Sequence, residues 1–137
     1  MSLAKQPKYE FELEALLTLL AAEKKDVEIR IRRLDGKLKR AQINHKRRLQ
    51  RVADIEQRIR ESTTRLVSRP DERITGEMIR ERTRVLGALR LDLSWHRRKA
   101  ERRADTVRLF RSQLRAQEAR RKEIQAEIDE LDRQKGD

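Results

Sequence analysis

An apolar residue recurs alternately every four and every three residues through most of this 137-residue chain. The repeat constrains the fold because a strict period of 3.5 is typical of the contact stripe of a coiled coil. Of the 16 positions in the first half 12 are apolar, and of the 16 in the second half 11 are apolar. We refer to these positions as the seam. The first half of the seam is Leu13, Leu17, Leu20, Lys24, Val27, Ile31, Leu34, Leu38, Ala41, His45, Arg48, Val52, Ile55, Ile59, Ser62 and Leu66. The second half is Ile79, Arg82, Leu86, Leu89, Leu93, His96, Ala100, Arg103, Val107, Phe110, Leu114, Gln117, Arg121, Ile124, Ile128 and Leu131.

The two halves are separated by a short break at Ser68-Arg69-Pro70-Asp71. Pro70 cannot continue a helix, and it disfavours the helical conformation at the residue before it. We expect one helix over 8–67, a turn over 68–73 and a second helix over 74–134, with Asp71 or Thr75 capping the second helix. Helices of equal length joined by a short turn fold back on each other. The sequence therefore predicts an all-α fold, a single long antiparallel two-helix coiled-coil hairpin that occupies residues 1–137 as one domain.

In such a hairpin the two halves of the seam align from end to end without a slip. The expected partners, from the turn to the open end, are Leu66 with Ile79, Val52 with Leu93, Arg48 with His96, Lys24 with Arg121, and Leu13 with Leu131. The polar seam residues have two interpretations. They weaken the pairing locally and help to fix its register while their charged ends reach water, or they meet the carboxylates of a partner.

The composition agrees with a narrow core. Charged residues make up 44% of the chain and aromatic residues only 3%, so the bulk that fills a wide globular core is missing. The absence of cysteine excludes disulfides, thiolate metal sites and a cysteine nucleophile. The longest apolar run, residues 15–22, contains Thr18 and is too short to span a bilayer. We therefore expect a soluble, cytoplasmic protein.

No pattern in the sequence predicts catalysis. His45 and His96 fall near the same level of the hairpin, but both lie among arginines whose charge would oppose a metal cation. The sequence has no phosphate-cradling glycine-rich loop and no HExxH motif. A two-helix hairpin also lacks the concave, enclosed site that catalysis uses. We expect a protein that is not an enzyme and that binds no metal or cofactor.

The net charge of +12 is concentrated in the middle of the predicted hairpin. The proposed basic surface consists of Lys46, Arg47, Arg51, Arg97, Arg98 and Arg102. Such a surface attracts nucleic-acid phosphates, and the binding weakens steeply with salt. Single-strand binders also interleave stacking aromatic residues, and here only Trp95 is present. Nucleic acid, an acidic protein partner and a merely solvated surface all remain alternatives.

Apolar residues outside the seam predict contacts with partners. Near the N-terminus, Tyr9, Phe11, Leu16 and Leu19 widen the apolar face beyond the stripe that one partner helix covers. This wider face indicates self-association or a second protein that grips the open end of the hairpin. Near the turn, Val85 lies outside the repeat in the same way.

The N-terminal residues carry a resemblance to a known family. The segment Tyr9-Glu10-Phe11-Glu12-Leu13-Glu14-Ala15-Leu16-Leu17, followed by Leu19 and Glu23, resembles the start of FliJ proteins. FliJ proteins are flagellar type III export components whose injectisome counterparts are the YscO (SctO) proteins. The stretch from Glu77-Met78 to Leu89 is similar to the corresponding place in FliJ, and chain length and the antiparallel hairpin also match.

The resemblance implies a central stalk that inserts into a hexameric export ATPase, stimulates it and links it to the export-gate membrane protein. It assigns ATPase binding to Tyr9, Phe11, Leu13, Leu16, Leu17 and Leu20, and export-gate binding to Met78, Val85, Leu86 and Leu89. Val85 stands where the family presents an aromatic residue, so the sequence departs from the family at the gate contact.

The same resemblance implies a cytoplasmic protein peripheral to the inner-membrane secretion apparatus, without membrane insertion. It adds export chaperones as further partners and does not separate a flagellar from an injectisome system. The alternative function is that of a basic coiled-coil protein that binds nucleic acid or acts as a scaffold.

Overall fold

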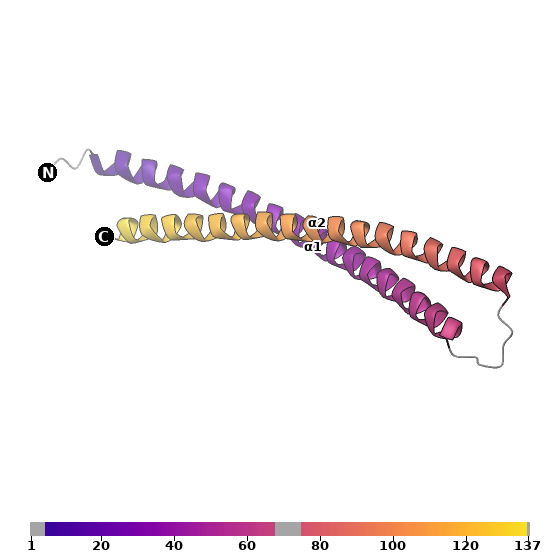
Figure 1. The fold of residues 1–137 in the computed structure, drawn as a ribbon. Helices are drawn as coiled ribbons and strands as arrows, with labels where there is room; N and C mark the ends of the chain where they lie inside the picture. Colours follow the sequence, from indigo (N-terminus) through magenta and orange to yellow (C-terminus); the bar gives the residue numbers. More distant parts are fainter. Residues whose placement is uncertain (1–4, 68–74, 137) are drawn as a thin grey trace. The chain divides into compact units, whose positions relative to one another are not determined.

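The computed structural model describes the chain over residues 5–67 and 75–136, and the side chains over residues 10–64 and 75–136. Two long helices, α1 (Lys5–Val67) and α2 (Gly76–Gly136), account for the described backbone apart from Thr75 (Figure 1). No strand occurs in these ranges. The predicted all-α helical hairpin is confirmed, whereas the expected turn over 68–73 and the possible cap at Asp71 lie outside the described residues.

Thr75 caps the start of α2. The Met78 backbone N–H donates a hydrogen bond of 3.2 Å to the Thr75 hydroxyl oxygen, and the Ile79 N–H donates one of 3.1 Å to the Thr75 carbonyl. The hydroxyl thereby satisfies one of the backbone donors that every helix leaves unpaired in its first turn. This cap accounts for the start of α2 at Gly76 rather than at residue 74.

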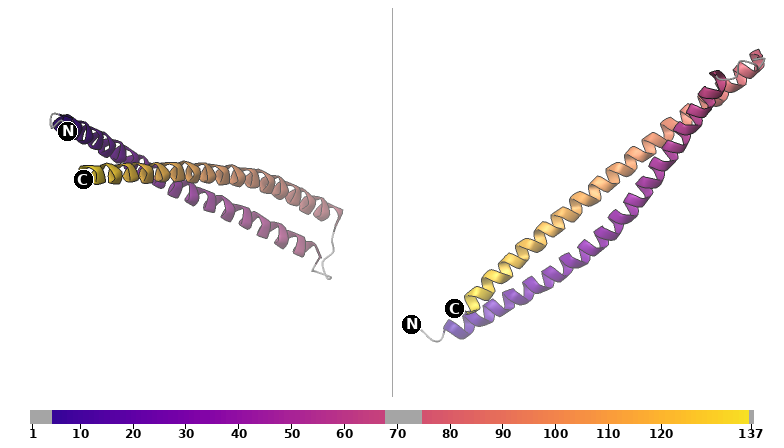
Figure 2. Two further views of the ribbon diagram at one scale, coloured as in Figure 1. Left: turned by 90° about the vertical axis from the view of Figure 1, so that its left-hand side faces the viewer. Right: turned by 90° about the horizontal axis from the view of Figure 1, so that it is seen from below.

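Each helix contributes to two compact units. Unit 1 combines Met1–Leu38 with Leu109–Asp137, and unit 2 is Lys39–Arg108. In unit 1 the start of α1 and the end of α2 run side by side in opposite directions (Figure 2). A contact of 3.4 Å between Lys135 Nζ and the Glu14 carboxylate joins them there.

The core of both units consists of seam positions alone. All nine buried hydrophobic side chains among the described residues are Leu13, Val27 and Ile124 in unit 1, and Ala41, Val52, Ile55, Leu86, Ala100 and Val107 in unit 2. No described residue outside the seam is buried. The period of 3.5 therefore identifies the core correctly, since two helices can cover only one stripe on each other.

Most of the remaining described seam positions are half-buried, with two exceptions. Arg103 is exposed because its long side chain reaches water from a seam position. Ile79 is also exposed, and the side chain of its expected partner, Leu66, lies outside the described residues. Two of the expected polar pairs lie close together, since Lys24 and Arg121 line one hollow of unit 1.

Arg48 and His96, the second of these polar pairs, line one hollow of unit 2. In the same unit, Arg97 bridges to Glu56 across the two helices with an N–O distance of 3.4 Å. Both expected polar pairs therefore lie together across the two helices, as an antiparallel arrangement requires.

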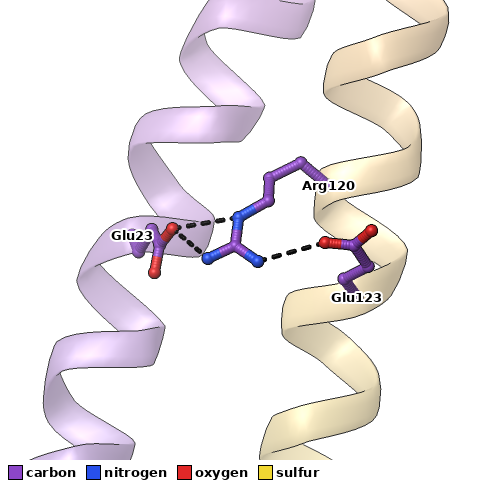
Figure 3. A network of polar contacts seen from close by, with 3 residues as sticks. All are labelled: Glu23, Arg120 and Glu123. Carbon is purple, nitrogen blue, oxygen red and sulfur yellow. Dashed lines mark hydrogen bonds and ion pairs between the residues drawn. The ribbon is translucent and has the colours of Figure 1, made fainter.

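Arg120 forms a polar link between α1 and α2 in unit 1 (Figure 3). Its Nε donates a hydrogen bond of 3.1 Å to Glu23 on α1, a second guanidinium nitrogen donates to the same oxygen, and a third donates over 3.2 Å to Glu123. The hydrogen bonds to Glu23, and then to Glu123, raise the pKa of Arg120 above its ordinary value. Arg120 thus stays cationic and holds two carboxylates, one from each helix.

Loss of the most deeply buried side chain in unit 1 is expected to destabilise the hairpin. Ile124 is 0% exposed, and Ile124→Ala should lower the free energy of unfolding by about 2 kcal/mol. This loss is at the lower end of the range for truncating a buried isoleucine to alanine, because a narrow seam can relax around the cavity that is left. Urea unfolding followed by circular dichroism measures the change. Ile29→Ala removes the same atoms from an exposed position of unit 1 and should cost less than about 0.5 kcal/mol. Equal decreases in the free energy of unfolding for the two variants would contradict the seam as the source of stability.

Removal of the Arg120 link should lower the midpoint of thermal unfolding by a small, salt-dependent amount, because exposed ion pairs are screened by salt. We expect Arg120→Gln to melt below the wild type at low salt, with the difference narrowing in 1 M salt, as followed by circular dichroism. Arg115→Gln is the control, since Arg115 is exposed in the same unit and forms no ion pair with any described residue. An Arg120→Gln midpoint equal to that of the control would show that the link contributes nothing.

Candidate functional site

Unit 1 presents an apolar surface on α1 that the seam does not use. Phe11, Leu16 and Leu19 are 73%, 50% and 67% exposed, and Ala15 and Ala22 beside them are exposed as well. A helix turns by about 100° per residue, so Phe11, Ala15, Leu19 and Ala22 fall on one face, with Leu16 between that face and the seam. We call these five residues the N-terminal apolar surface. Surfaces of this kind on a soluble helix are typical of contacts with another protein.

The six residues predicted to bind an ATPase divide into three groups. Phe11 and Leu16 are exposed and lie on the N-terminal apolar surface. Leu13 is buried, while Leu17 and Leu20 are half-buried, because these three occupy the seam. A partner could reach Leu13 only by parting the helices. The side chain of Tyr9 lies outside the described residues.

The residues predicted to bind an export gate lie at the start of α2, in unit 2. Val85 is exposed, Met78 and Leu89 are half-buried, and Leu86 is buried in the seam. Met78 lines a hollow with Thr75, Glu77 and Arg84, whereas Leu89 lines a different hollow. The structure thus leaves Val85 and part of Met78 accessible to a partner, and it places Leu86 between the helices.

A second surface lies farther along unit 2, where both helices line one hollow of about 580 Å³. Helix α1 contributes three arginines and an amide, and α2 contributes an arginine, an indole and an imidazole. We call this feature the basic hollow, and its lining is Asn44, Arg47, Arg48, Arg51, Trp95, His96 and Arg103. The arrangement can bind anions, because guanidinium groups match the geometry of phosphate and carboxylate groups.

Trp95 organises the side chains of the basic hollow. Trp95 is 48% exposed, and two cations lie over its ring, Arg48 at 5.7 Å and Lys99 at 5.1 Å from the ring centroid. The imidazole of His96 meets the ring edge-on, with centroids 4.7 Å apart and an interplanar angle of 87°. Cation–π contacts of this length are attractive, so the indole fixes the positions of two positive charges at the hollow.

The positive charge of the basic hollow is not neutralised from within. No carboxylate of the described residues forms an ion pair with Arg47, Arg48, Arg51 or Arg103. The nearest acidic lining belongs to an adjoining hollow, which contains Asp54 and Asp92 and shares Arg51 and His96 with the basic hollow. The four arginines of the basic hollow therefore have guanidinium donors available for an external anion.

The structure divides the predicted basic surface. Arg47 and Arg51 line the basic hollow, whereas Lys46, Arg98 and Arg102 are exposed without lining it. Arg98 donates a hydrogen bond of 3.4 Å to the Ser94 hydroxyl. Arg97 is bound to Glu56, so its charge is already compensated.

The basic surface predicted from the sequence includes only Arg47 and Arg51 of the residues that line the basic hollow. Asn44 and Arg51 are one heptad apart and thus share a flank of the seam. Lys99 lies on the matching flank of α2. The seam register already pairs His96 with Arg48, whereas Trp95 lies outside the seam and its contact with Arg48 depends on side-chain directions.

Two further features of the described residues bear on function. No group of three histidine or acidic side chains able to hold a metal ion occurs among the side chains described, over 10–64 and 75–136. In the same ranges, neither helix contains a stretch both long enough and apolar enough to cross a membrane.

Comparisons of the chain with protein-family models, with curated proteins and with solved structures give no match.

Proposed function

We propose that the protein is a central-stalk component of a type III protein export apparatus, of the FliJ and YscO kind. In this role it inserts into and stimulates a hexameric export ATPase and links that ATPase to the export gate. The observation that carries the proposal is the exposure of Phe11, Leu16 and Leu19 on a helix whose seam is already occupied. Apolar side chains that the hairpin does not cover are available to a partner, and they belong to the segment that carries the resemblance.

The proposed mechanism is mechanical and allosteric. The N-terminal apolar surface occupies one face of one helix, so it meets the six subunits of a ring unequally. A ligand shifts a conformational equilibrium only by the difference in its affinity for the two states. A stalk that binds the closed form of one subunit more tightly than the open form therefore favours nucleotide closure at that subunit.

Contact with the export gate is assigned to the start of α2. Val85 and the accessible part of Met78 are the apolar side chains that a gate protein would bind there. This assignment places the protein in the cytoplasm, peripheral to the inner-membrane secretion apparatus. Export chaperones are proposed as additional partners.

The stalk proposal predicts that truncation of the N-terminal apolar surface uncouples the protein from its ATPase. The double variant Phe11→Ala with Leu16→Ala should abolish stimulation of the cognate ATPase and weaken binding by about tenfold or more, as loss of interface anchors does. Helix content should be unchanged, because both side chains are exposed. The measurement is phosphate release by the purified ATPase with each variant.

A matched control removes the same kind of side chain elsewhere. Ile43 and Leu91 are exposed apolar residues of unit 2, and the double variant Ile43→Ala with Leu91→Ala should stimulate the ATPase like the wild type. Undiminished stimulation by the Phe11 and Leu16 variant would contradict the proposed site. A failure of the wild-type protein to bind the ATPase would contradict the function itself.

A further inference from the structure

We infer that the basic hollow of unit 2 binds the linked phosphates of a single nucleic-acid strand, without regard to base sequence. The inference does not depend on the stalk proposal, because it concerns different residues in a different unit. It is carried by the positions of the cations, by the extent of the hollow along the helices and by the contacts of Trp95.

The first argument is the number and origin of the cations. Arg47, Arg48 and Arg51 reach the hollow from α1, and Arg103 reaches it from α2. Lys99 adds a fifth positive charge over the ring of Trp95. An uncompensated group of cations in a concave site raises the local concentration of anions, and arginine binds phosphate through two parallel hydrogen bonds.

The second argument is the extent of the site. Asn44 and Arg51 both line it, and seven residues of helix span about 10 Å at ~1.5 Å per residue. One phosphate group contacts only part of such a length. A chain of phosphates fits better because Arg47 and Arg51, about 6 Å apart along the helix, can bind different phosphates of one strand.

The third argument is the role of Trp95. In non-specific single-strand binders, aromatic rings stack on bases. Here Arg48 and Lys99 already lie over the ring, so the indole positions cations instead of receiving a base. Binding through phosphates alone carries no sequence information.

The surroundings favour a nucleic-acid strand over an acidic peptide. Further exposed cations lie within the same stretches of the two helices without lining the hollow, at Lys46 on α1 and at Arg98 and Arg102 on α2, and the whole chain has a net charge of +12. A strand with a charge on every nucleotide can use this extended surface. Asp54 and Asp92 repel phosphate and mark one end of the site.

The chain provides its own reporter for the test, because Trp95 is its single tryptophan. An oligothymidylate of about 16 nucleotides, which covers a typical single-strand site, is titrated into the full-length protein. Emission from Trp95 and the anisotropy of a label on the oligonucleotide are recorded together. We expect saturable binding that changes Trp95 emission and weakens with salt.

Two charge-reversal variants separate the hollow from diffuse attraction. Arg47→Glu with Arg51→Glu should weaken binding at least tenfold and reduce the salt slope by about 1.4, at ~0.7 for each phosphate contact with a single strand. Arg98→Glu with Arg102→Glu makes the same change of net charge outside the hollow. This second variant should weaken binding less than the first does, and it should preserve the change in Trp95 emission on binding. Circular dichroism establishes that both variants remain helical.

Three results would overturn the inference. Equal losses of affinity in the two variants would show diffuse attraction without a site. Binding that leaves Trp95 emission unchanged would place the strand elsewhere. A polyglutamate peptide that binds as tightly as the oligonucleotide at equal charge would show that the hollow takes carboxylates. None of these outcomes bears on ATPase stimulation, so the stalk proposal is tested separately.

Discussion

Burial of one apolar stripe on each helix is the interaction on which the rest of the structure depends. Every buried side chain among the described residues belongs to that stripe, and these residues form no second layer of buried side chains that could add to the stability. The hydrophobic effect scales with the apolar area removed from water, so fully buried side chains such as Val27 and Ile124 contribute most to the free energy of folding. A core of this width leaves most other described side chains at least partly exposed, so both candidate surfaces lie where side chains reach water.

The two units use the same stripe differently. In unit 1 the buried side chains of the stripe are the large Leu13, Val27 and Ile124, and Arg120 of α2 links the helices through Glu23 of α1. In unit 2 the seam includes two small buried residues, Ala41 and Ala100, and the arginines Arg48 and Arg103. Long cationic side chains reach outward from a seam, and Arg48 and Arg103 line the basic hollow together with His96. A change in seam composition thus turns one part of a uniform repeat into an anion-binding surface.

The sequence predicts the fold well because a period of 3.5 is a geometric property of packed helices. It predicts the candidate sites less well, since one residue cannot serve both the core and a partner. Leu13 and Leu86 were assigned to partners by resemblance, yet the seam buries both. The basic hollow depends on side-chain directions, such as those that bring Arg48 over the ring of Trp95, and linear charge counts do not contain them.

Antiparallel pairing of α1 and α2 of one chain along the seam is tested most directly by chemical cross-linking. The chain has no cysteine, so Glu23→Cys with Arg120→Cys can be joined by a short bis-maleimide and the product weighed by mass spectrometry. The pair Glu23→Cys with Lys135→Cys is the control, since Lys135 lies about 22 Å farther along α2. Antiparallel pairing predicts an efficient cross-link within one chain for the Glu23 and Arg120 positions only. A cross-link formed only between two chains, or equally well by both pairs, would contradict it.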